Sequence, residues 1–226
     1  MEIGGVTLKL KSIVMFDQES RIKDPKENLN FITRCITDLF ESFLETYETE
    51  DCKQLNFILG DFVEFKIDAE MDGFYDIEVP FDKSNFLLIE DSLKKRELAR
   101  TLEKGLRFVS KEKGWDEKPF LKALDKMKEI QYKNQYYAFK HFKLNPSKTL
   151  KANVLCEFDL YTFRIFIEVY DRKKEPNLIS KECIYETLPL EYEFLRLMHK
   201  LEWLNDNEVA LYKNSHKVKY KSLKIN

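Results

Sequence analysis

The sequence predicts an α+β protein, in which an antiparallel or mixed β-sheet carries about four helices. In several short segments apolar and polar residues alternate, which is typical of half-buried strands. In others the apolar residues recur every three or four positions, which is typical of amphipathic helices. The two kinds of segment come in clusters rather than in strict alternation, which favours α+β over a doubly wound parallel sheet.

The first 91 residues are expected to form a strand, a helix and a hairpin. Alternation over 6–16 indicates the strand, and an apolar stripe over 25–49 indicates the helix, with a proline in its first turn. Alternation resumes over 55–69 and over 75–79. The turn signal at 71–73 predicts that the last two strands form a hairpin.

The rest of the chain is expected to begin with two helices and to continue as a strand-rich region. The helices are predicted over 92–113 and 119–131, and Gly114 is a natural stop for the first of them. One domain over 1–226 is the expected organisation, with a boundary near 114–119 as the alternative. The later elements are predicted as strands at 137–141, 152–158, 161–169 and 183–187, a loop at 171–177, a helix over 190–201 and a hairpin over 209–220.

Charge divides the chain unequally. Residues 1–91 carry 21 Asp and Glu against 9 Lys and Arg, a net charge of −12, and residues 92–226 carry 19 against 29, a net charge of +10. Such an asymmetry indicates what kind of partner a protein binds rather than which fold it has. The expected location is the cytoplasm, because no apolar run approaches the roughly 20 residues of a membrane helix and the first residues lack the features of a signal peptide.

Carboxylates concentrated in the predicted hairpin are the strongest functional signal. If the apolar residues of the hairpin face the core, its acidic residues share the outer face, where like charges would lie opposite one another. Such a face is easier to understand if a basic partner covers it. The predicted protein-binding residues are Glu64, Asp68, Glu70, Asp72, Asp76 and Glu78 of the hairpin, together with Glu41 and Glu45 of the first helix.

Catalytic residues, metals and cofactors are not expected. The histidines at 141, 199 and 216 have no Ser or Cys beside them in a nucleophile elbow, and the chain lacks a glycine-rich phosphate loop. The four cysteines are scattered without a C-x-x-C pair, which argues against a zinc site and a disulfide framework.

Two alternative functions stay open. Glu64-x-Lys66 resembles the acid-x-Lys half of the PD-(D/E)xK nuclease signature, which implies metal-dependent hydrolysis by two carboxylates and a lysine. The alternative of nucleic-acid binding rests on two basic segments that contain aromatic residues, although the overall charge of −2 opposes strong phosphate binding. Their lysines are Lys133, Lys140, Lys143, Lys148 and Lys151 in the first segment and Lys213, Lys217, Lys219, Lys221 and Lys224 in the tail.

In general character, a cytosolic chain with an acidic face and no catalytic motif resembles the bacterial immunity proteins of toxin–antitoxin and polymorphic-toxin systems. That resemblance implies a non-enzymatic protein that binds and neutralises a basic partner, either a toxin or a nucleic-acid-processing enzyme. The physical reason is electrostatic complementarity, because carboxylates can occupy a cationic groove that normally receives phosphates. Protein binding through the acidic residues is therefore the predicted function, and neither nucleic acid nor a membrane is the expected partner.

Overall fold

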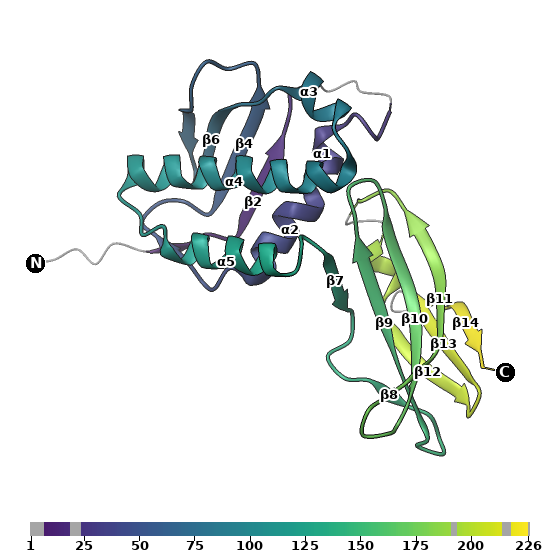
Figure 1. Cartoon of the computed structure of the whole chain (residues 1–226). Coiled ribbons are helices and arrows are strands. Elements are labelled where there is room, and N and C mark those ends of the chain that lie inside the picture. Colours follow the sequence, from purple (N-terminus) through teal and green to yellow (C-terminus); the bar gives the residue numbers. More distant parts are fainter. Residues whose placement is uncertain (1–6, 19–23, 191–193, 214–217, 226) are drawn as a thin grey trace, which may run out of the picture. The chain divides into compact units, whose positions relative to one another are not determined.

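The structure is a computed structural model that describes residues 7–18, 24–190, 194–213 and 218–225 (Figure 1). Helices and several sheets are both present, which confirms the α+β class. Two compact units divide the chain, Met1–Asn134 (unit 1) and Gln135–Asn226 (unit 2). The segment 114–119 lies inside unit 1, where it connects two helices. That the two units together form one domain stays a prediction.

A four-stranded mixed sheet forms the centre of unit 1, with the strand order β2-β4-β6-β5. The first three strands are parallel and β5 is antiparallel to β6 at the edge. A separate two-stranded sheet pairs β1 with β3. The strands are β1 (Leu8–Lys9), β2 (Ser12–Phe16), β3 (Glu48–Thr49), β4 (Gln54–Gly60), β5 (Lys66–Met71) and β6 (Phe74–Pro80).

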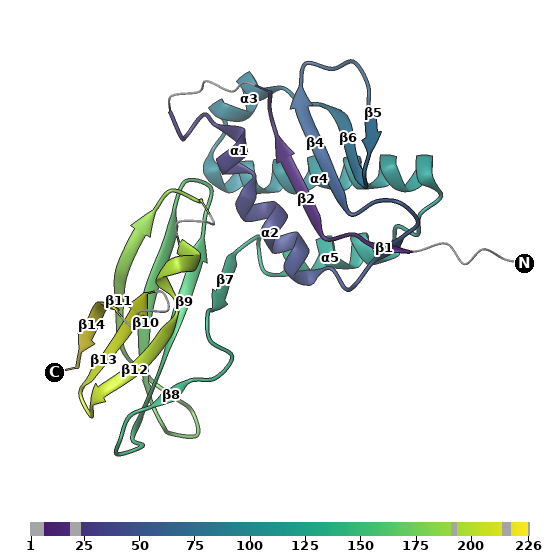
Figure 2. The same ribbon diagram turned by 180° about the vertical axis from the view of Figure 1, so that it is seen from behind.

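Helices cover one face of this sheet. The longest, α4, crosses in front of the strands in Figure 1 and behind them in Figure 2. Residues at odd positions of β2, β4 and β6, among them Met15, Phe57 and Ile77, are buried on the sheet. The helices are α1 (Leu29–Ile32), α2 (Arg34–Phe43), α3 (Lys83–Leu88), α4 (Asp91–Lys113) and α5 (Lys118–Glu129).

The helix predicted over 25–49 is shorter than expected and is divided. Asn28 caps α1 by accepting a hydrogen bond from the backbone N–H of Asn30, so the helix begins at Leu29, four residues after Pro25. Thr33 separates α1 from α2, and its Oγ1 lies 2.6 Å from the carbonyl oxygen of Met15 and 2.8 Å from that of Leu29. A threonine bonded to the preceding turn bends a helix. By contrast, α4 and its end at Gly114, which has a φ of 66°, confirm the prediction.

Unit 2 consists of two sheets. One has the order β11-β10-β9-β7, with β8 also pairing to β9, and the other has the order β12-β13-β14. The predicted loop at 171–177 is confirmed between β10 and β11. The strands are β7 (Asn134–Tyr137), β8 (Lys143–Leu144), β9 (Leu150–Phe158), β10 (Phe163–Asp171), β11 (Leu178–Thr187), β12 (Lys200–Asn205), β13 (Glu208–Lys213) and β14 (Val218–Lys224).

The helix predicted over 190–201 does not continue to its predicted end, and residues 191–193 lie outside the described residues. In the described part of that segment, a single turn of 3₁₀ helix, η1 (Leu195–Leu197), is followed by β12. Phe194 stacks on Phe163 of β10 with the ring centroids 3.5 Å apart, and Leu201 pairs with Leu211 of β13. The apolar residues at helical spacing therefore belong to two different elements of one core, and tertiary packing overrides the local pattern. Of the predicted final hairpin, the turn at 214–217 lies outside the described residues.

Candidate functional site

The predicted acidic hairpin forms the edge of the sheet in unit 1. All residues of β5 are exposed except the half-buried Ile67, and no described strand pairs with the outer side of β5. Asp72 and Gly73 make the turn with φ values of 52° and 84°. Two successive positive φ angles are the signature of a type I′ turn, for which Asp-Gly is a favoured sequence. The hairpin and its turn are confirmed.

The carboxylates of the hairpin do not oppose one another, contrary to expectation. A bulge at Asp68 places Ala69 opposite Asp76, and Lys66 lies opposite Glu78. Because a bulge adds one residue to one strand, the side chains beyond it change faces. Glu70 thus lies opposite Tyr75, whose side chain is buried against the helices. The bulge removes the like-charge repulsion that simple alternation predicts.

Lysines partly neutralise the hairpin. Lys66 Nζ lies 2.6 Å from a carboxylate oxygen of Asp68 and 3.9 Å from one of Glu78. Lys113 of α4 lies 2.5 Å from the carboxylate of Glu70. Asp76 instead accepts a hydrogen bond of 2.7 Å from the Asn56 side chain. The charged groups of these ion pairs are partly exposed to solvent, and pairs of this kind contribute little to stability.

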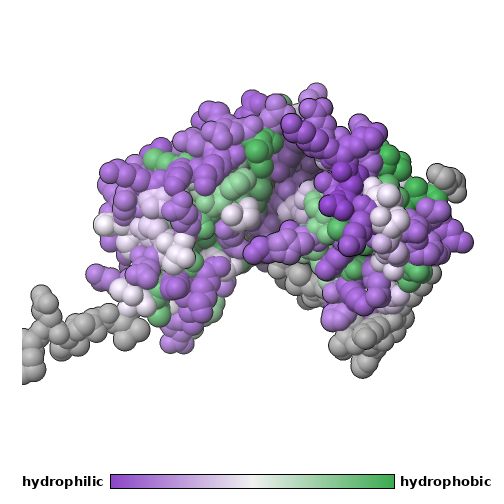
Figure 3. Space-filling model, turned by 90° about the horizontal axis from the view of Figure 1, so that it is seen from below, coloured by the Kyte–Doolittle hydropathy of each residue, from purple (hydrophilic) through white to green (hydrophobic). Residues whose placement is uncertain are grey.

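Two of the hairpin carboxylates have neither an ion pair nor a side-chain hydrogen bond with a described residue. These are Glu64, in the loop before β5, and Asp72 in the turn, and both side chains are exposed. Exposed hydrophobic side chains flank them, with Val63 100% and Met71 72% accessible. Figure 3 shows one face of the molecule, on which hydrophobic residues form patches among hydrophilic ones. An exposed edge with mixed acidic and apolar residues is suited to contact another protein.

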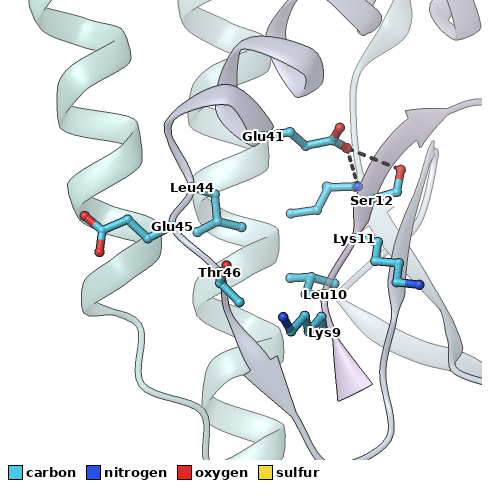
Figure 4. A pocket seen from close by; sticks show the side chains of 9 residues that line it. Lys9, Leu10, Lys11, Ser12, Glu41, Leu44, Glu45 and Thr46 are labelled. Carbon is cyan, nitrogen blue, oxygen red and sulfur yellow. Dashed lines mark hydrogen bonds between the residues drawn. The ribbon is translucent and has the colours of Figure 1, made fainter. Parts of the chain in front are cut away.

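The structure does not bring Glu41 and Glu45 together with the hairpin. Glu41 accepts a 2.6 Å hydrogen bond from the backbone N–H of Ile13, and its carboxylate also lies 3.3 Å from Ser12 Oγ (Figure 4). Both partners are in β2, which lies at the opposite edge of the sheet from β5. Desolvation by burial is the main cause that raises the pKa of Glu41. This carboxylate therefore holds α2 on the sheet.

Glu45 follows α2 on the surface. Its carboxylate lies 2.6 Å from Nζ of Lys122 in α5, and the hydrogen bond and charge of Lys122 lower its pKa. Both of its neighbours in Figure 4, Leu44 and Thr46, line a pocket of about 230 Å³ beside the start of β2. The predicted acidic surface is thus divided between two edges of the sheet.

Sequence reasoning missed an acidic pocket next to the turn of the hairpin. It has a volume of about 360 Å³, and four carboxylates and one lysine ammonium lie among its lining residues. Two aromatic side chains, Tyr47 and Trp115, also line it, with ring centroids 6.0 Å apart. The charged lining residues are Glu48, Glu50, Asp51, Asp116 and Lys113.

Lys113 connects this pocket to the hairpin. Its ammonium lies 4.4 Å from the ring centroid of Tyr75 and also pairs with Glu70 of β5. Trp115 stacks on the same Tyr75 ring at 6.2 Å and 16°. The acidic residues at 48–51 can be read from the sequence. Nothing in the sequence shows that Trp115 lines a pocket with them, or that Lys113 connects this pocket to Glu70. Aromatic faces beside carboxylates attract cations, so the pocket and hairpin together form an acidic surface.

The residues of the alternative functions are dispersed. Glu64 lies outside the strand that contains Lys66, and within the described ranges no group of three or more His, Cys, Asp or Glu side chains is placed to hold a metal ion. In the first basic segment, Lys151 lies over the ring of Phe142 at 5.2 Å. Lys217 lies outside the described residues.

No helix in the described part of the chain is both long and apolar enough to cross a membrane. No protein-family model, curated protein or solved structure matches the chain.

Proposed function

We propose that unit 1 binds a basic segment of another protein through an acidic surface made of Glu64, β5, the turn at Asp72 and the pocket beside Lys113. The observation that carries the proposal is the junction at Lys113, where the exposed hairpin adjoins a pocket with four carboxylates and two aromatic rings. A lysine or arginine side chain of the partner fits such a pocket by charge and by cation–π contact. The exposed edge of β5 supplies unpaired backbone groups for an extended segment.

The partner class that we propose is a basic toxin or a nucleic-acid-processing enzyme, which this protein neutralises without catalysis. Support comes from chemistry alone, since a protein that binds phosphates presents cations that carboxylates can occupy. The net charge also differs in sign between the two parts of the chain, because the acidic residues concentrate in the first part. Glu41 is not included in this surface, because its carboxylate is bound to β2.

A charge-reversal pair tests the proposal. Partners are captured from the native cell with the wild-type chain and identified, and each complex is then measured by calorimetry with purified proteins. Glu64→Lys combined with Asp72→Lys should weaken the complex at least about tenfold and reduce its dependence on salt. Both side chains are exposed, but Asp72 has a positive φ, so the lysine there adds strain to the turn and circular dichroism must confirm that the variant keeps the fold.

The matched control is Asp125→Lys combined with Glu129→Lys. These residues are exposed in α5, and their replacement changes the net charge by the same amount. The control should bind like the wild type, because its carboxylates lie outside the proposed surface. A Glu64/Asp72 variant that binds as tightly as the control would rule out the acidic surface. A captured enzyme whose activity is unaffected by the wild-type chain would rule out neutralisation while leaving binding intact.

A further inference from the structure

A third pocket in unit 1 lies where the parallel strands β2, β4 and β6 end. Its volume is about 250 Å³, and Asp17, Asp61, Phe62, Phe81 and Lys83 are among the residues that line it. Asp17 directly follows β2, Asp61 follows β4 and Phe81 follows β6. Open α/β sheets commonly bind ligands at the carboxyl ends of their strands, because the loops there converge. None of these residues belongs to the acidic surface proposed above.

Asp17 is the residue that makes this pocket unusual. The residue is only 5% exposed, and one carboxylate oxygen, Oδ2, lies 2.6 Å from Lys83 Nζ. The other oxygen, Oδ1, is buried, and no described residue donates a hydrogen bond to it. A buried polar atom without a partner costs about 1–3 kcal/mol, and more if it is charged. The site therefore lacks one hydrogen-bond donor.

The backbone around Asp17 is held in place. Its N–H donates a hydrogen bond of 3.2 Å to Oδ1 of Asn30 in α1. Thr33 fixes the same helix to the carbonyl of Met15, two residues before Asp17. Because both contacts tie the end of β2 to α1 and its last turn, hydrogen bonds to a helix fix the backbone that carries the carboxylate.

The opposite wall of the pocket is built around Gly60. Its carbonyl accepts hydrogen bonds from the N–H groups of Phe62 at 2.8 Å and Phe81 at 2.9 Å, which holds both residues at the end of the strands. A Cβ at Gly60 would lie 3.0 Å from the Phe62 ring, so the absence of a side chain lets this ring approach. Two aromatic residues thus line the same pocket as two carboxylates and one ammonium.

We propose that this pocket binds a small organic cation that carries N–H donors, namely a primary ammonium or guanidinium group. One N–H of the ligand donates to Oδ1 of Asp17, while Lys83 keeps its bond to Oδ2. The charges favour a cation, since the two carboxylates of Asp17 and Asp61 outnumber the ammonium of Lys83. The rings of Phe62 and Phe81 favour the same ligand class, because aromatic faces attract organic cations.

Titrations followed by NMR test this proposal. n-Butylguanidinium should shift the backbone amide signals of Gly60 and Phe62 in a saturable way, whereas the neutral isostere n-butylurea should not. A titration with Nα-acetyl-arginine amide shows whether the guanidinium group belongs to a protein side chain or to a free small molecule. If it binds as well, the pocket accepts an arginine side chain of a protein, and if only n-butylguanidinium binds, the ligand is a free small molecule.

Variants locate the binding group. Asp17→Asn should weaken binding at least about tenfold, as expected for the loss of a hydrogen bond to a charged group. Asp61→Asn, at an exposed position that should not affect folding, should weaken it severalfold. Asp125→Asn removes an exposed carboxylate of α5 outside the pocket and should leave binding unchanged.

Several outcomes would overturn the proposal. These are the absence of saturable shifts with n-butylguanidinium, equal shifts with n-butylurea, or Mg²⁺ shifting the same amides more strongly than the organic cation. Unchanged binding by folded Asp17→Asn would do the same. If that variant does not fold, unchanged binding by Asp61→Asn decides against the site.

Discussion

Gly105 of α4 lies against the ring of Phe57 in β4. A Cβ at Gly105 would come within 2.7 Å of this ring, closer than side-chain atoms normally approach. Both residues are buried in unit 1. The missing side chain lets α4 approach the centre of the sheet, and the contact sets the position of the helix whose last residue is Lys113.

Replacing Gly105 with alanine should destabilise the protein by about 1–3 kcal/mol, because overpacking a core forces side chains or backbone to shift. The cost should exceed the roughly 1 kcal/mol that alanine gains in helix propensity. Urea unfolding measures the difference. Adding Phe57→Leu should recover part of the loss, since the smaller side chain makes room.

Gly114→Ala is the control for this prediction. Gly114 has a φ of 66° and no other atom within 4 Å of a Cβ built there. Its replacement should cost about 1 kcal/mol through backbone strain, and Phe57→Leu should not relieve that cost. A Gly105→Ala variant more stable than the wild type would contradict the close contact.

Glu41 should make stability depend on pH in a direction opposite to that of an ordinary salt-bridged carboxylate. Its pKa is raised in the folded protein, chiefly by desolvation, so the folded state holds the proton more tightly than the unfolded state. Stability from this group is therefore present below the ordinary glutamate pKa of 4.5 and is lost as the pH rises through the higher folded pKa. Glu41→Gln should become more stable relative to the wild type as the pH rises above 4.5.

Glu45→Gln should change the pH dependence of stability in the opposite direction. The pKa of Glu45 is lowered by Lys122, so its contribution is present above the ordinary glutamate pKa and is lost as the pH falls through the lower folded pKa. Because the side chain is exposed, the effect should be small and should disappear in high salt. Parallel pH dependences of the two variants in urea unfolding would show that Glu41 is not desolvated as described.

Cys183 should react with thiol reagents much faster than the other cysteines. Cys183 is exposed, whereas Cys35, Cys52 and Cys156 are buried. Burial raises the pKa of Cys52 and of Cys156 to about 12, which leaves little reactive thiolate at neutral pH. Labelling with a maleimide followed by mass spectrometry should show one fast site in the native protein and four sites after denaturation.

The Cys183→Ser variant should lose the fast reaction and unfold like the wild type. Fast labelling of Cys52 or Cys156 in the native protein would mean that the core of the corresponding unit opens readily, because a buried thiol reacts only after such opening.

Asn145 should be the most sensitive polar residue of unit 2. Its side chain is 2% exposed, donates to the carbonyl oxygen of Asp206, and accepts the backbone N–H groups of Thr149 and Leu150. Asn145→Ala should destabilise the protein by about 2–4 kcal/mol, because it leaves several backbone groups without partners.

Asn177→Ala is the comparison for Asn145. Asn177 is exposed in the loop between β10 and β11 and donates from its side chain to Asp171. Its loss should cost less than about 1 kcal/mol, because water replaces the missing partner. Equal costs for the two variants in thermal unfolding would contradict the buried network around Asn145.

The sequence by itself determined the fold class, α4 and its end at Gly114, and the hairpin with its Asp72-Gly73 turn. These features depend on local physics, namely the period of apolar residues and the backbone freedom of glycine. The sequence also indicated where carboxylates concentrate, because charge patterning needs no knowledge of contacts.

Only the tertiary structure decided which carboxylates belong together. The bulge at Asp68 changes which side chains face each other, and sheet order separates Glu41 from β5 by two strands. The pocket beside Lys113 joins residues from 47–51 and 113–116, and the pocket at Asp17 joins the ends of three strands. Such sites depend on long-range strand pairing and on packing, which local residue patterns do not encode.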